Sequence, residues 1–205
     1  MMSRDARWVA AAVQLVIAWE WLVSGANKIL SGSFPQGLAD VLRQGMQDNP
    51  NGWYVALLER VVLPHSVFFG YLIEETEILV GFALLIGAVA LTGPMRRRGA
   101  PEHRLLTVEI GAATVATLVC AFLCVNFHFF MGDSIIPWIN PSNAYNEGIT
   151  LDTLMPPLSI LLFVFNARVL VELTETPVSA WARRVIQSLS ALVRRNQPAA
   201  SLTTH

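Results

Sequence analysis

Residues 66–91 read SVFFGYLIEETEILVGFALLIGAVAL, and this stretch decides the fold. It exceeds the roughly 20 mainly apolar residues that a helix needs to cross a bilayer. It nevertheless carries Glu74, Glu75 and Glu77. Ionised side chains within a bilayer are costly and are found mostly where they face the interior of a helical bundle. We therefore expect a transmembrane helix whose carboxylates face protein and carry function.

Three further apolar stretches are long enough to span a bilayer. The composition, 54% hydrophobic and 14% charged among 205 residues, is typical of membrane proteins rather than soluble domains. We predict an all-α integral membrane protein, a four-transmembrane-helix bundle that forms one membrane domain over residues 1–175. The predicted helices span about residues 9–30, 66–91, 105–130 and 154–172.

Basic residues are distributed unevenly between these predicted helices. Residues 131–153 contain no Lys or Arg, whereas the other side of the bundle is rich in them. The positive-inside rule then predicts cytoplasmic N- and C-termini and two larger loops outside, in a bacterial inner membrane. The basic residues of the predicted cytoplasmic side are Arg4, Arg7, Arg96, Arg97, Arg98, Arg104, Arg168, Arg183, Arg184, Arg194 and Arg195.

Shorter elements are expected outside the four spans. Apolar residues recur at near-helical period over residues 38–46, which predicts a short amphipathic helix on the outer face. A second should cover residues 53–62 and end at Pro64. Residues 131–157 should form an ordered outer cap. Residues 176–205 should form an amphipathic basic helix on the cytoplasmic leaflet, or one that docks a partner, followed by a flexible tail.

The carboxylates of the second span fall into two groups by helical phase. Gly70, Glu74, Glu77 and Gly81 follow the spacing i, i+4, i+7, i+11 and share one stripe, while Glu75 points about 100° away. Small residues let a neighbouring membrane helix approach closely. The stripe should therefore face protein.

The first span supplies a candidate partner for this stripe. Glu20, Ser24 and Lys28 are spaced i, i+4, i+8 and share a face. With the two helices antiparallel, a rise of about 1.5 Å per residue places Glu20 and Glu77 near the midplane and Lys28 at the outer rim. We predict a contact between Lys28 and Glu74.

The charges in the membrane region do not balance. Four glutamates face one lysine there, and burial disfavours an ionised carboxylate that no cation compensates. Some of the glutamates should be neutral at pH 7, or be partnered by Arg60, His65, another chain or a bound cation. Groups poised in this way suit proton uptake and release. The alternative is a set of hydrogen bonds that hold the bundle together.

The third span offers polar residues near its outer end and two cysteines. Asn126 and His128 point in nearly opposite directions, and the face of His128 is favoured to reach the glutamates. Cys120 and Cys124 match neither a CxxC redox motif nor a zinc spacing, which favours a packing role. No metal site is predicted.

The first half of the chain resembles a known family. The segments SGANK at 24–28, EETE at 74–77 and VGFALLIG at 80–87 resemble the four-helix DoxX/DoxD-like membrane proteins. The similarity in motif covers about residues 19–87. Asn49-Pro50 and Trp53-Tyr54 in the long first loop look closer to the DoxD branch, the membrane subunit of thiosulfate:quinone oxidoreductase.

This resemblance implies an electron transfer from thiosulfate to membrane quinone, with tetrathionate as product and a second subunit on the outer side. Glu74, Glu77 and Lys28 would be the catalytic, proton-handling residues. Quinone is the expected cofactor, since the sequence has no haem, flavin or iron–sulfur motif. The candidate quinone-binding residues are His128, Asn126 and Glu20.

A noncatalytic role is the alternative to this redox function. The outer helices and basic tail would also suit an accessory or scaffold subunit of a larger respiratory or photosynthetic membrane complex. The expected partners are the lipid bilayer, other membrane or outer-side subunits, or a second copy of the chain. Nucleic acid is not an expected partner.

Overall fold

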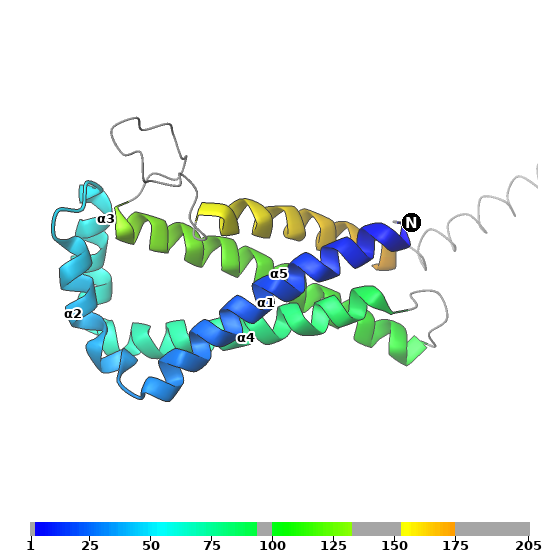
Figure 1. Cartoon of the computed structure of the whole chain (residues 1–205), viewed down its shortest axis with the longest axis horizontal. Helices are drawn as coiled ribbons and strands as arrows, with labels where there is room; N and C mark the ends of the chain where they lie inside the picture. The colour runs from blue at the N-terminus through cyan, green and yellow to red at the C-terminus, as the bar shows by residue number, and fades with distance from the viewer. Residues whose placement is uncertain (1–2, 94–99, 133–152, 175–205) are drawn as a thin grey trace, which may run out of the picture.

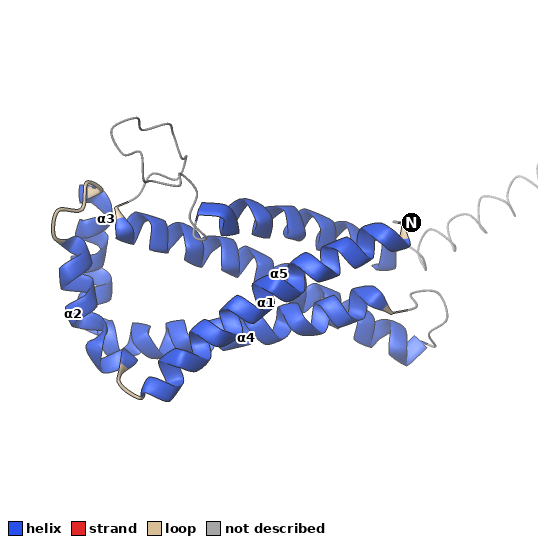
Figure 2. Ribbon diagram, viewed as in Figure 1, coloured by secondary structure: helices blue, strands red, loops and turns tan. Residues whose placement is uncertain are grey.

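The structure is a computed structural model that describes residues 3–93, 100–132 and 153–174. Every element within these ranges is helical (Figures 1 and 2). Four helices are long and apolar enough to cross a membrane, which makes the protein a multi-pass membrane protein and confirms the four predicted spans. They are α1 (Arg4–Ser31), α4 (Ser66–Thr92), α5 (Ala100–Met131) and the unlabelled helix Thr153–Thr174.

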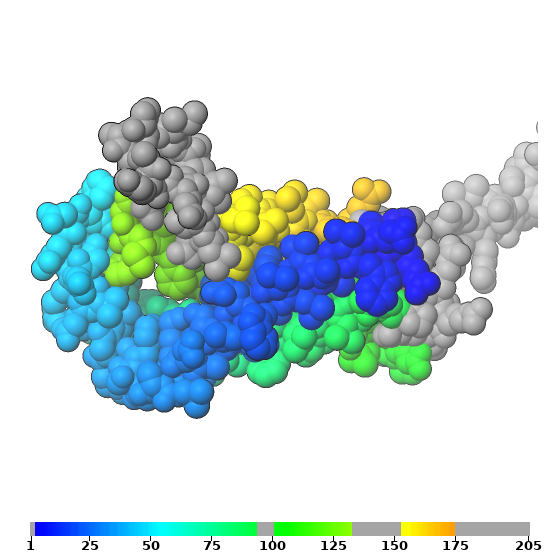
Figure 3. Space-filling view, viewed as in Figure 1, coloured from blue at the N-terminus to red at the C-terminus, as the bar shows by residue number. Residues whose placement is uncertain are grey.

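The helices α1 and α4 form the closest pair and lie side by side (Figure 1). All four residues of the predicted stripe are buried, so the stripe does face protein. A Cβ atom added at Gly81 would lie 2.6 Å from Leu22 Cγ, and one at Gly25 would lie 2.8 Å from Ile78 Cγ1. The absent side chains therefore allow the two backbones to approach. In Figure 3, α1 crosses the visible face diagonally, from beside the Thr153–Thr174 helix to the α2 segment.

Buried amides tie three of the four long helices together. Gln14 Nε2 donates to the Leu84 carbonyl at 2.8 Å, and Asn166 Nδ2 donates to Gln14 Oε1 at 2.9 Å. Both amide side chains are fully buried. Lipid supplies no hydrogen-bond partner, so polar side chains within a bundle bond across helices. The contacts join α1 to α4 and to the Thr153–Thr174 helix.

Polar side chains also close helix ends, where carbonyl groups lack partners within the helix. Arg7 Nη1 donates to the carbonyls of Leu91 and Gly93, both at 3.2 Å, at the C-terminal end of α4. Asn49 Nδ2 donates to the carbonyls of Phe129 and Phe130, at 3.0 and 2.9 Å, near the end of α5. Arg7 thus joins α1 to the end of α4, and Asn49 fixes the connection between α2 and α3 to the end of α5.

Helices occupy the first loop where two were predicted, but the second does not end at Pro64. The segment from Gly52 to Thr92 is one continuous 41-residue helix, so that prediction is wrong. A π-helical turn and a 3₁₀ turn precede α4 and shift the backbone hydrogen bonds around Pro64, which lets the helix continue through the proline. The elements of this layer are α2 (Phe34–Met46), α3 (Gly52–Leu57), η1 (Leu58–Val62) and η2 (Leu63–His65).

This layer packs its apolar side chains over one end of the bundle (Figure 1). Tyr54 is buried within it, and its hydroxyl donates to the Asn126 carbonyl at 3.1 Å. The buried residues of the layer are Leu38, Leu42, Tyr54 and Leu58, packed against Phe129 and Phe130 of α5. Most of the predicted cap over residues 131–157, and all of the predicted segment 176–205, lie outside the described residues.

The close approach of α1 and α4 generates a stability prediction. Gly81→Ala should destabilise the protein by about 1–3 kcal/mol, because the new methyl overpacks against Leu22. This loss outweighs the gain of about 1 kcal/mol that alanine brings to a helix. Gly111→Ala in α5 is the matched control, since nothing lies within 4 Å of its added Cβ. Thermal unfolding in detergent measures both, and equal melting temperatures for the two variants would contradict the prediction.

Candidate functional site

Lys28 and Glu77 form an ion pair between α1 and α4. Lys28 Nζ lies 2.6 Å from Glu77 Oε2 and 2.8 Å from Oε1, and it donates to Ser24 Oγ at 2.7 Å. The side chain of Glu77 is 1% exposed and that of Lys28 is 21% exposed. An ammonium group has three N–H donors, and here three oxygen atoms accept from it. The charge of Glu77 is therefore compensated within the membrane region.

The predicted contact of Lys28 with Glu74 is wrong, and the helix geometry explains why. Packing of Gly81 on Leu22 sets the register, which places the backbone of Lys28 opposite the first carboxylates of α4. Side chains lean toward the N-terminus of their own helix. In an antiparallel pair, Lys28 and Glu77 therefore lean toward each other, while Glu74 leans away along α4.

Glu74 lies one turn before Glu77 on the same stripe and is 5% exposed. Its Oε2 atom is buried and has no hydrogen-bond partner within the described residues. None of the ion pairs found in those ranges includes Glu74. The site thus contains two neighbouring glutamates in different states. Lys28 compensates the charge of Glu77, whereas the described residues supply no cation to Glu74.

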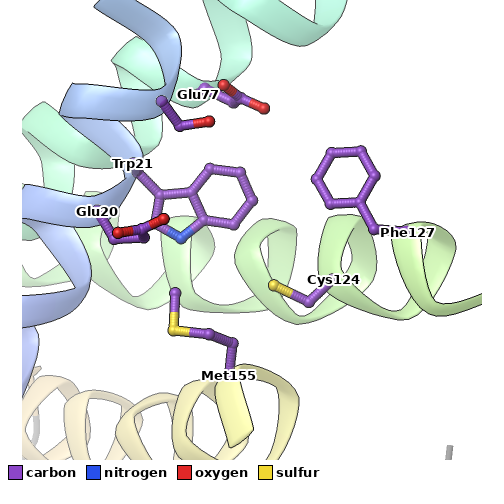
Figure 4. Close-up of a pocket in the computed structure, with 7 residues that line it drawn as sticks. Glu20, Trp21, Glu77, Cys124, Phe127 and Met155 are labelled. Atoms are coloured by element: carbon purple, nitrogen blue, oxygen red, sulfur yellow. The ribbon is translucent and has the colours of Figure 1, made fainter. Parts of the chain in front are cut away.

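A small cavity lies beside Glu77, between the long helices of the bundle (Figure 4). Its volume is about 60 Å³, and α1, α4, α5 and the Thr153–Thr174 helix all contribute to its walls. Glu20 is exposed on α1 yet also lines the cavity, so it marks the rim. The lining residues are Glu20, Trp21, Ser24, Glu77, Cys124, Phe127 and Met155.

The size and charge of this cavity restrict what it can hold. One water molecule needs roughly 10–15 Å³ of such space, so a few waters fit. Pockets for drug-sized ligands occupy roughly 300–1,000 Å³, and a quinone ring does not fit this cavity. A thiosulfate dianion would meet the carboxylate of Glu20, which repels it, and a Glu77 carboxylate whose counter-charge Lys28 already supplies. The cavity suits water, protons or a small cation.

The other predicted site residues point to different sides of their helices. His128 is buried, but no contact with the glutamates toward which it was predicted to point is recorded among the described residues, whereas Asn126 is partly exposed and donates to the Phe122 carbonyl at 2.7 Å. Neither lines the cavity. Glu75 is exposed on the far side of α4 from the stripe. The structure therefore brings together Lys28, Glu77 and Glu20, and leaves Asn126, His128 and Glu75 outside the cavity wall.

Sulfur-containing residues form the part of the site that the sequence did not indicate. Trp21 Nε1 donates to Cys120 Sγ at 2.9 Å, and Cys120 Sγ lies 2.9 Å from Ser159 Oγ. Cys124 hydrogen-bonds Cys120 and faces the cavity. The signal in the sequence was the i, i+4 spacing of two cysteines on a buried helix face. The contribution of the Thr153–Thr174 helix could not be read from spacing, because it depends on how that helix packs.

Within the described residues, no group of three or more His, Cys, Asp or Glu side chains is arranged to hold a metal ion. Comparison of the chain with known protein families, with curated proteins and with solved structures finds no match.

Proposed function

We propose that this protein is a membrane subunit that handles protons within the bilayer, with Glu74 as the group that takes up and releases the proton. One observation carries the proposal. Glu74 is buried and has an unbonded carboxyl oxygen within the described residues, one turn from a carboxylate that a lysine fully satisfies.

The contacts of Lys28 distinguish the two glutamates. Its three donors are taken by Ser24 and by both oxygens of Glu77, so it has none left for Glu74. A buried charge without a partner is costly, and within the described residues that cost falls on Glu74 and not on Glu77. This difference makes Glu74 the group to which we assign proton exchange.

A route to the ion pair runs through the small cavity. Glu20 stands at its rim, and Ser24 and Glu77 line its wall. Water molecules that bridge polar groups are nearly as favourable in enthalpy as direct hydrogen bonds. A few waters would therefore connect Glu20 with Glu77, which lies one helical turn from Glu74.

The resemblance to DoxX/DoxD-like proteins gives this proton chemistry a context. Quinone reduction consumes protons, which a buried carboxyl group can supply to a redox partner. The cavity does not admit a quinone ring, so we assign no step through quinone to its residues. Electron transfer from thiosulfate to quinone stays a prediction, and it would need a further subunit on the outer side of the membrane.

We further propose an inner-membrane location with both termini in the cytoplasm. The support is the excess of arginine at the N-terminus, between α4 and α5, and after the Thr153–Thr174 helix. This orientation puts α2 and α3 on the outer side, where α2 buries Leu38 and Leu42 and exposes Asp40 and Arg43. An alkaline phosphatase fusion at the C-terminus that is active would contradict it.

A noncatalytic subunit is the second candidate, and Glu75 favours it. This carboxylate is exposed on an otherwise apolar face of α4, beside Leu72 and Leu79. A charged residue that faces lipid is rare, so a neighbouring chain with a hydrogen-bond donor or cation would suit this face. Both candidates are subunits, and they differ in whether Glu74 exchanges a proton.

Glu74→Gln tests the proton role directly. Infrared spectra of the purified protein in liposomes, recorded over a range of pH, should contain the C=O stretch of a protonated carboxyl group. We expect this band to lose the Glu74 component in the variant, because glutamine has no titratable proton. Glu59→Gln, at an exposed site in η1, is the control and should leave the band unchanged. A spectrum of Glu74→Gln identical to that of the wild type would remove the proton role.

Purification from native membranes separates the two candidates. A redox subunit should co-purify with an electron-transfer partner, and thiosulfate-dependent quinone reduction by the assembly should fall with Glu77→Gln while the assembly stays intact. A scaffold subunit should co-purify with a stoichiometric partner whose turnover is the same with either residue. Thiosulfate-dependent quinone reduction by the isolated chain would contradict the scaffold role.

A further inference from the structure

Two sulfur-bearing residues from two helices line the cavity, and a third lies behind them in the bundle. Cys124 of α5 and Met155 of the Thr153–Thr174 helix line it, and Figure 4 shows both side chains directed into the same space. Cys120, one turn from Cys124, is hydrogen-bonded to it. All three residues are buried.

We propose that Cys120, Cys124 and Met155 bind one soft monovalent metal ion, Cu(I), at the inner wall of this cavity. The inference goes beyond the proton role and does not depend on it. It assigns to the two cysteines a function that their spacing in the sequence did not indicate.

The ligand types select the class of ion. Thiolate and thioether sulfur prefer soft ions such as Cu(I), whereas carboxylate and carbonyl oxygen prefer hard ions such as magnesium or calcium. Structural zinc takes four Cys, His or carboxylate ligands in a tetrahedron, and no such group occurs among the described side chains. Two thiols and one thioether are sufficient for Cu(I), which accepts low coordination numbers.

The surroundings favour a cation and balance the protons. Binding forms two thiolate–copper bonds, breaks two S–H bonds and releases two protons; copper stays in the same oxidation state. The carboxylate of Glu20 lines the same cavity and attracts a cation into it, whereas the charge of Glu77 is compensated by Lys28. Both released protons can leave to water at the exposed rim beside Glu20.

The environment of Cys120 also suits a sulfur that carries negative charge. Trp21 directs its indole N–H at Cys120 Sγ, at 2.9 Å, and the Ser159 hydroxyl lies 2.9 Å away on the opposite helix. Hydrogen bonds to metal ligands hold them in position and strengthen binding.

Cu(I) binding by the purified full-length protein tests the proposal. Anaerobic titration against a chromogenic Cu(I) chelator should give one ion per chain, and X-ray absorption should show sulfur as the only first-shell ligand. Cys124→Ser should weaken binding by at least about 100-fold, and Met155→Leu by about tenfold. Met131→Leu is the matched control, because Met131 is exposed at the end of α5, and should bind as the wild type does.

Several outcomes would overturn the copper site. They are a Cys120→Ser/Cys124→Ser double variant that binds Cu(I) as tightly as the wild type, a first shell of nitrogen or oxygen, and thiols that copper does not protect from alkylation. If gel filtration shows that Cys124→Ser does not fold, the copper affinity of Met155→Leu and the X-ray absorption spectrum of the wild type test the site instead. Glu74→Gln should keep full copper affinity, so failure of the proton role and failure of the copper site are distinguishable.

Discussion

The hydrocarbon core of a bilayer offers no hydrogen-bond partner, so every polar group that this bundle carries into it must be satisfied by the bundle itself. Gln14 meets this constraint through the Leu84 carbonyl and Asn166, and Arg7 meets it at the end of α4. Glu77 meets it through Lys28. These contacts fix the positions of α1, α4 and the Thr153–Thr174 helix. Glu74 Oε2 is a buried carboxyl oxygen with no hydrogen-bond partner among the described residues, and Asn166 Oδ1 is likewise unpartnered there.

Much of the fold follows from the sequence, because span length and helical phase are local properties. Three of the four long helices begin and end within five residues of their predicted limits, and the other reaches back to Gly52. The stripe from Gly70 to Gly81 is buried, as its spacing indicated. The error at Pro64 has a local cause that propensity does not reveal. A change to π and 3₁₀ hydrogen bonding lets the helix continue through proline.

The site was less predictable, because its geometry depends on packing between helices. The face that carries Lys28 could be read from spacing, but its choice of Glu77 over Glu74 depends on the α1–α4 register and on the lean of each side chain. The cavity joins residues of four helices, including Met155 near the far end of the chain. The carboxylates of Glu20 and Glu77 and the side chains of Cys124 and Met155 line the same small space.

The central claim is that Lys28 and Glu77 act as one charge pair on which the α1–α4 interface depends. Charge reversal measures this most directly, by unfolding in detergent of Lys28→Glu, Glu77→Lys and the double variant. Each single reversal should cost at least about 3 kcal/mol, since it buries like charges together, and the double variant should recover most of that loss. Reversal of the exposed pair Arg43 and Asp40 is the control and should change stability by less than about 1 kcal/mol. Single reversals at Lys28 and Glu77 that are harmless, or whose effects simply add in the double variant, would contradict the account.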